Sequence, residues 1–100
     1  MSVTGYIRGR PAGATVTSVA SVATSTTIIV ANRLRSGVAV TNTDANTLYL
    51  LVGGGTASAT NFSVALAQNA HWEAPYGFTG AIAGIWASDG AGAALVTEYV

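Results

Sequence analysis

Short segments in which apolar and polar residues alternate run through most of this 100-residue chain. The clearest is residues 61–67, where Phe62, Val64 and Leu66 alternate with Ser and Ala. Such a period of two is typical of a β-strand with one buried face. No segment keeps the spacing of an amphipathic helix. The pattern therefore predicts an all-β chain.

Eight segments separated by turn signals are predicted as strands, and they are residues 14–23, 26–30, 37–43, 47–52, 61–67, 70–74, 81–87 and 93–100. The turn residues Thr43–Asn46 and Ser88–Gly92 each predict a hairpin between the strands that flank them. Regular short strands of this kind indicate an antiparallel β-sandwich or a jelly-roll-like domain over residues 14–100. The predicted core consists of Val38, Val40, Leu48, Leu50, Phe62, Val64, Leu66, Ile82 and Val96.

Residues 1–13 are predicted to form an extended N-terminal arm rather than an element of the domain, because Pro11 and three glycines interrupt them. Arg8 and Arg10 point to the same side of an extended segment, and Tyr6 and Ile7 beside them offer an apolar anchor. Two interpretations stay open at this level. The arm is either a frayed terminus or a segment that docks on a neighbouring subunit.

Charge is scarce, since the chain has four arginines, four acidic residues, no lysine and no cysteine. Charged residues make up 8% of the chain, against about a quarter in average soluble domains. A surface with so few solvated groups predicts a homo-oligomer, with a trimer as the expected state. The formal net charge of zero argues against nucleic-acid binding, which needs a dense basic patch.

Neither a transmembrane helix nor a signal peptide is recognisable, so no membrane partner is predicted and synthesis in a host cytoplasm is expected. Catalytic and cofactor-binding constellations are missing as well. His71 is the single histidine and stands two residues from Glu73, whereas a metal site needs three or four ligands. The glycines at 53–55 lack the lysine and helix of a phosphate-binding loop. We therefore expect no enzyme activity, no metal and no cofactor.

Aromatic and arginine side chains are the remaining candidates for a binding surface. The residues singled out, besides those of the arm, are Arg33, Arg35, Trp72, Tyr76 and Phe78. Tyr and Trp are enriched at interface hot spots, so an interface is one interpretation. Plugging of one end of the sandwich is another. A third is a carbohydrate-binding module in which Trp72, Tyr76 and Trp86 form a stacking surface.

Residues 36–99 resemble a group of small virion proteins of tailed bacteriophages. The resemblance lies in the turn before LYLLVG, the strand FSVAL, the stretch HWEAPYGFTGAIAGIWAS and the terminal ALVTEY. It implies a β-sandwich accessory subunit of the phage particle, foremost a head decoration (cement) protein. Such a subunit binds the major capsid protein on the outside of the head and clamps neighbouring capsid subunits. A neck, tail or head-fibre protein is the alternative within this class.

Overall fold

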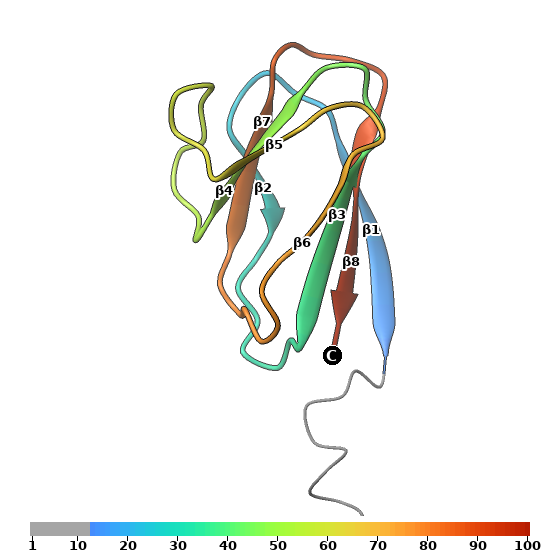
Figure 1. The fold of residues 1–100 in the computed structure, drawn as a ribbon, viewed down its shortest axis with the longest axis vertical. Coiled ribbons are helices and arrows are strands. Elements are labelled where there is room, and N and C mark those ends of the chain that lie inside the picture. The colour runs from blue at the N-terminus through green and yellow to red at the C-terminus, as the bar shows by residue number, and fades with distance from the viewer. Residues whose placement is uncertain (1–12) are drawn as a thin grey trace, which may run out of the picture.

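The strands of the domain are β1 (Ala14–Ala20), β2 (Thr26–Ile29), β3 (Gly37–Asn42), β4 (Leu48–Val52), β5 (Val64–Leu66), β6 (His71–Glu73), β7 (Ile82–Trp86) and β8 (Ala93–Tyr99). They come from a computed structural model, which describes residues 13–100 (Figure 1). All neighbouring strands pair antiparallel. The predicted all-β architecture is therefore confirmed, and residues 1–12 of the predicted arm lie outside the described residues.

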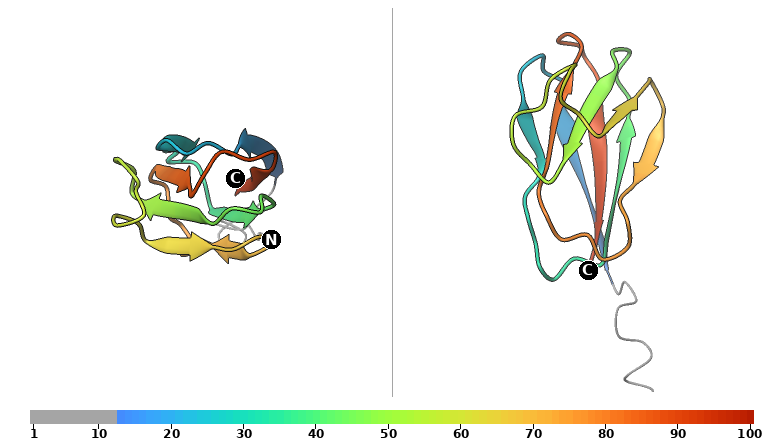
Figure 2. Two further views of the ribbon diagram at one scale, coloured as in Figure 1. Left: turned by 90° about the horizontal axis from the view of Figure 1, so that it is seen from above. Right: turned by 60° about the vertical axis from the view of Figure 1, so that its left-hand side comes forward.

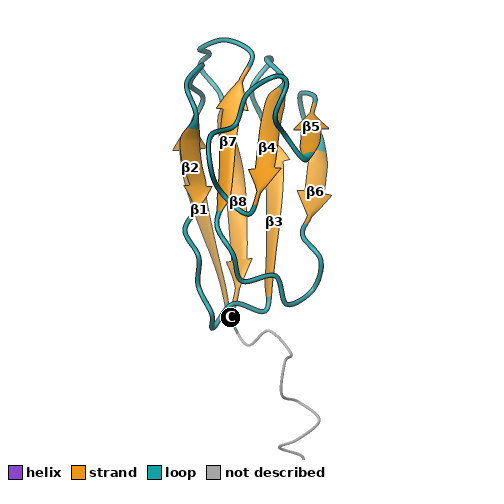
Figure 3. Ribbon diagram, turned by 90° about the vertical axis from the view of Figure 1, so that its left-hand side faces the viewer, coloured by secondary structure: helices purple, strands orange, loops and turns teal. Residues whose placement is uncertain are grey.

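The eight strands form two four-stranded sheets. The first sheet has the order β1-β8-β3-β6 and the second the order β2-β7-β4-β5. The two sheets face each other, with β1 over β2, β8 over β7, β3 over β4 and β6 over β5 (Figure 2, Figure 3). In the described part of the chain there is no helix that could span a membrane.

The core lies between the sheets and follows the alternation of each strand. In β3, for example, Val38 and Val40 point inward, and they are 2% and 0% exposed. Of the nine predicted core residues, seven are buried, and they are Val38, Val40, Leu48, Leu50, Leu66, Ile82 and Val96. Val64 is half-buried and packs against this cluster.

The two predicted hairpins are wrong. The segment after β3 leads to β4 and the segment after β7 leads to β8, but each of these pairs is divided between the two sheets. Apart from β4 and β5, no two consecutive strands are hydrogen-bonded neighbours in the described domain. The turns at 43–46 and 87–92 are therefore arches that cross from one sheet to the other.

A buried polar network holds the two arches together. The Asp44 carboxylate accepts hydrogen bonds from the backbone N–H of Asn46 and of Gly92, both at 2.8 Å. Asn42 is fully buried, and its side-chain oxygen accepts from Trp86 Nε1 at 3.0 Å. The short polar side chains that suggested a tight hairpin thus bond across the arches instead. They satisfy backbone groups that the crossing leaves without ladder partners.

Acid is expected to destabilise the domain in part through Asp44. The amides of Asn46 and Gly92 hold the pKa of the Asp44 carboxyl below its ordinary value. A depressed folded-state pKa contributes stability above the unfolded pKa of about 3.9 and loses it as the pH falls through the folded pKa. Urea unfolding at a series of pH values above and below this unfolded pKa measures the loss of stability. The variant Asp44→Asn should flatten the acid side of the profile, and an unchanged profile would contradict this role.

Phe62 departs from the predicted core, because it is 40% exposed. The strand that was expected from residue 61 begins only at Val64. Ahead of it, Ser58 and Asn61 form an isolated bridge within the loop between β4 and β5. The Phe62 ring lies 4.9 Å from that of Tyr49, a residue whose neighbours Leu48 and Leu50 point into the core. Phe62 therefore packs on the outer face of the second sheet.

The substitution Phe62→Ala is accordingly expected to cost only about 1 kcal/mol, the value of one exposed aromatic pair. By contrast, Leu66→Ala in the adjacent strand removes a side chain that is 4% exposed and should cost about 2–5 kcal/mol. Urea unfolding of the two variants compares them directly. Equal losses would show that Phe62 belongs to the core after all.

Candidate functional site

The residues singled out in the sequence do not gather into one patch. Arg33 and Tyr76 are exposed, Tyr76 at 69%. Trp72 and Phe78 are half-buried and pack against the core. Arg35 is 3% exposed. The remaining candidates, Tyr6, Ile7, Arg8 and Arg10, lie outside the described residues.

Arg35 is an internal anchor and not a surface contact, which corrects its interpretation as an interface residue. Its Nε donates to Glu98 Oε2 at 2.9 Å, and its side chain has no exposed surface. Its Nη1 donates to the carbonyl of Gly80 at 2.8 Å, and its Nη2 donates to the carbonyl of Val30. The planar fork of arginine suits such a set of acceptors. Arg35 therefore ties the segments before β3 and β7 to the end of β8.

Tyr76 owes its exposure to a tight turn. The amide of Phe78 donates to the carbonyl of Pro75 at 3.0 Å, and Gly77 has a φ of 83°. Such a turn needs a positive φ at its third residue, and glycine adopts this conformation without steric cost. The amide of Gly77 also donates to the carbonyl of Ser36 at 2.9 Å. The turn is therefore fixed to the start of β3, and it projects the Tyr76 ring outward.

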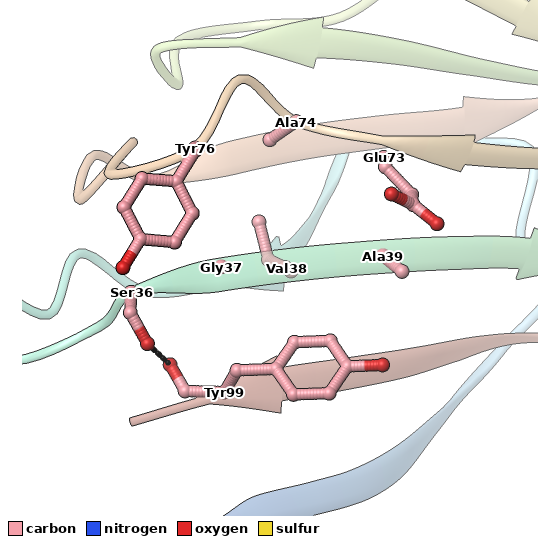
Figure 4. Close-up of a pocket in the computed structure, with 8 residues that line it drawn as sticks. All are labelled: Ser36, Gly37, Val38, Ala39, Glu73, Ala74, Tyr76 and Tyr99. Atoms are coloured by element: carbon pink, nitrogen blue, oxygen red, sulfur yellow. Dashed lines mark hydrogen bonds between the residues drawn. The ribbon is translucent and has the colours of Figure 1, made fainter. Parts of the chain in front are cut away.

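A shallow groove of about 280 Å³ runs beside this turn on the outer face of the first sheet. Tyr76 and Tyr99 lie on either side of β3, and Gly37 forms the floor between them (Figure 4). A side chain at position 37 would begin 3.4 Å from the Tyr99 ring, so glycine keeps the floor open. Glu73 supplies the carboxylate of the groove. The groove thus offers two phenol rings and one anionic group to a ligand.

Tyr99 and Gly37 were missed as site residues. In the predicted strand 93–100, Leu95, Thr97 and Tyr99 alternate with the core positions, so the outward direction of Tyr99 could be expected from the sequence. Its closeness to Tyr76 could not, because it depends on the pairing of β8 with β3 and of β3 with β6.

Thr41, His71 and Glu73 form a row on the same outer face. Thr41 Oγ1 lies 2.8 Å from His71 Nδ1, and His71 Nε2 lies 3.3 Å from Glu73 Oε2. Hydroxyl, imidazole and carboxylate thus occur in the order of a nucleophilic triad. However, the side chains of His71 and Glu73 are 52% and 73% exposed, and neither Thr41 nor His71 lines the groove. The row gives an acyl substrate no enclosed pocket, and it fits an exposed hydrogen-bond chain.

Residues 13–100 contain no group of three or more His, Cys, Asp or Glu side chains placed to hold a metal ion. The carboxylates are also spread over the molecule. Asp44 is buried in the arch network, Asp89 accepts from the backbone N–H of Ala23 at 2.6 Å, and Glu98 pairs with Arg35.

The described surface is almost without charge. Of the six charged side chains among residues 13–100, Arg35 and Asp44 are buried and Glu98 is half-buried. Only Arg33, Glu73 and Asp89 belong to exposed residues. The other exposed side chains are small, hydroxylic, amide, apolar or aromatic, with His71 among them.

Comparison of the chain with known protein families, with curated proteins and with solved structures finds no match.

Proposed function

We propose that this chain is a structural protein of a tailed-bacteriophage particle, namely a decoration protein on the outside of the head. In this role it binds the major capsid protein, associates with further copies of itself and joins neighbouring capsid subunits. It carries out no catalysis and takes no cofactor. The proposal includes the prediction that the protein is a trimer, and a measurement of its molecular mass in solution tests this.

The single observation that supports this proposal most is the scarcity of exposed charge. Three exposed charged residues on an eight-stranded domain leave most of the surface neutral. Burying a charge without a partner is costly, whereas neutral side chains are covered at a small cost. The buried centres of protein interfaces are depleted of charged residues for the same reason. A surface of this kind suits a protein that is permanently covered by other protein in an assembly.

The outer face of the first sheet gives the same indication. In β8 and β1 the outward positions are occupied by small or neutral residues such as Ser18, Leu95 and Thr97. Val16 on this face is 64% exposed and Leu95 is 39% exposed. The part of this face formed by β1 and β8 is neutral, so it can contact a flat partner without desolvating an ion, whereas Glu73 lies beyond β3 at the groove.

The carbohydrate-binding alternative loses two of its three aromatic rings. Trp86 is 1% exposed and donates to Asn42 inside the core. Trp72 packs against the core as well. Tyr76 is the one ring of the three that is exposed, so the expected stacking surface is not assembled.

The composition of the particle tests the proposal. Phage particles made from the genome that encodes this chain are purified, and the copy number of the chain is measured against the major capsid protein by quantitative mass spectrometry. A decoration protein follows the symmetry of the shell and is present in hundreds of copies. About a dozen copies would instead identify a neck or fibre protein. Absence from the particle would overturn the virion assignment.

The arm gives a further prediction within this function. Deletion of residues 2–10 should leave the fold intact, because all eight strands lie between Ala14 and Tyr99. We expect the truncated protein to bind particles that lack the wild-type protein about tenfold more weakly, since Arg8 and Arg10 can each pair with a carboxylate of the partner. The double variant Arg8→Ala/Arg10→Ala should reproduce part of the loss in a cosedimentation assay. Unchanged affinity of the folded truncated protein would refute a docking role.

A further inference from the structure

The four edge strands of the sandwich differ in how well they are protected. An open edge presents unpaired N–H and C=O groups, and proteins blunt such edges with short strands, bulges or charges. In the second sheet, β2 has four residues and a register shift, and β5 has three residues. In the first sheet, β6 has three residues and carries His71 and Glu73. These three edges are blunted in the expected ways.

The fourth edge, β1, is not blunted in the described structure. It has seven residues, and its register with β8 runs from Ala14 to Ala20 without a shift. Six of its seven residues are exposed, and its sequence ATVTSVA contains neither a charge nor a proline. A long, regular and neutral edge of this kind is a site for pairing with another strand.

The hydrogen bonds at both ends of β1 show which backbone groups face outward. Gly13 and Val100 exchange two hydrogen bonds, at 3.2 and 3.0 Å, and the amide of Ser21 donates to the carbonyl of Gly92 at 3.1 Å. Because bonding alternates along an antiparallel pair, the odd-numbered residues of β1 bond to β8. The N–H and C=O groups of Ala14, Val16, Ser18 and Ala20 therefore point to the free edge.

We propose that a second copy of this chain covers this edge, with the two β1 strands paired antiparallel around a two-fold axis at Thr17. This register places Ala14 opposite Ala20 and Val16 opposite Ser18. It satisfies every outward-facing N–H and C=O group of both strands, whereas a shift by two residues leaves some of them unpaired. The contact joins the two first sheets into one continuous sheet. A two-fold contact closes on two copies, so it goes beyond the predicted trimer, whose own contacts would lie elsewhere on the domain.

Side chains near the edge fit this occupant. Each strand is neutral, so no like charges meet when it faces its own copy. Thr17 lies opposite Thr17, and cross-strand Thr pairs are favourable. Beside β1, an open seam of about 390 Å³ between the sheets is lined by Thr17, Val19, Ile29 and Val30, among others. Val30 is 67% exposed, so a second copy across the axis also shields apolar surface along the seam.

Single cysteines test the register, and the absence of cysteine from the natural sequence makes the readout clean. Thr17 forms a non-hydrogen-bonded pair in the proposed contact, with Cα atoms about 4.5 Å apart, which lies within disulfide range. The full-length variant Thr17→Cys is oxidised mildly at micromolar concentration and analysed by non-reducing electrophoresis. The matched control is Thr15→Cys, an exposed threonine on the same face of the same strand. In the proposed register position 15 lies opposite Val19, so the two cysteines of a Thr15→Cys dimer are not neighbours.

We expect a covalent dimer with Thr17→Cys and little with Thr15→Cys. In a second measurement, Thr17→Lys places two like charges opposite each other and should raise the dissociation constant in sedimentation equilibrium about tenfold or more. Ala65→Lys on the distant edge strand β5 is the control and should leave the constant unchanged.

Three results would overturn the contact. The first is a wild-type protein that stays monomeric at high micromolar concentration, whatever else covers β1. A trimer whose Thr17→Cys variant does not cross-link is another. Equal cross-linking of Thr17→Cys and Thr15→Cys is the third. All of these use the isolated protein, so failure of the contact is distinguishable from failure of the virion assignment, which particle composition tests.

Discussion

Replacing Arg35 with alanine is expected to lower the free energy of unfolding by about 3–5 kcal/mol, the usual cost of removing one partner of a buried ion pair. The guanidinium has no exposed surface, and it donates to Glu98 at 2.9 Å and to the carbonyl of Gly80 at 2.8 Å. Without it, the carbonyls of Gly80 and Val30 lose the guanidinium as their donor. The Glu98 carboxylate, 24% exposed, loses its ion-pair partner and keeps the Asn32 side-chain amide, at 3.3 Å. Buried acceptors without a donor carry a desolvation penalty that the unfolded chain does not have.

The matched control is Arg33→Ala, two residues away. Arg33 is exposed, and no hydrogen bond or ion pair involves it within residues 13–100, so its loss should change stability by no more than about 0.5 kcal/mol. Arg35→Lys should fall between the two, because a compact ammonium keeps the charge but does not reach all the acceptors of the fork. Urea unfolding measures all three variants. If Arg35→Ala were as mild as Arg33→Ala, the buried anchor would not exist in solution.

The alternation of side chains carried enough information to predict the strands. Each of the eight predicted segments contains an observed strand, because burial of one face imposes a period of two on any sheet. The pairing of the strands was not predictable in the same way. An Asp- or Asn-rich turn satisfies its own backbone locally, and it does so whether the next strand stays in the sheet or crosses to the other one.

Two polar residues stand at inward-facing positions of their strands, and the period of two alone does not say what they bond to. Asn42 follows Val38 and Val40 at the next inward position of β3, and Glu98 follows Ala94 and Val96 at the next inward position of β8. A polar residue in such a place requires a buried partner. The partner of Glu98, however, is Arg35 in a loop 63 residues away, and no short-range pattern connects the two.

The groove could not be predicted from the sequence for a similar reason. Pro75 and Gly77 indicate a turn, and a turn places Tyr76 at the surface. Its second wall, Tyr99, arrives from the last strand through the ladder between β8 and β3. The sequence therefore predicts the exposed ring but not the pocket that it borders.

Replacing Asn42 with leucine is expected to cost about 3–5 kcal/mol, although the two side chains have the same number of heavy atoms. The Asn42 side chain is fully buried, and all its bonding capacity is used. Its Nδ2 donates to the carbonyls of Asn46 and Leu66, both at 2.9 Å. Its Oδ1 accepts from the amide of Asp44 and from Trp86 Nε1, both at 3.0 Å. Leucine leaves these four groups without their partner, at about 1–3 kcal/mol for each that water does not reach.

Asn61→Leu is the matched control, because exposed Asn61 donates one side-chain hydrogen bond, to the carbonyl of Thr56 at 2.9 Å, and should cost about 0.5–1.5 kcal/mol. The variant Trp86→Phe separates lost packing from lost hydrogen bonding. It removes the indole N–H, so in the double variant Asn42→Leu/Trp86→Phe one orphaned donor is gone. The double variant should therefore lose about 1 kcal/mol less than the sum of the two single variants in urea unfolding. Strict additivity would mean that the bond between Asn42 and Trp86 contributes nothing, and that the arches are held by the remaining polar contacts alone.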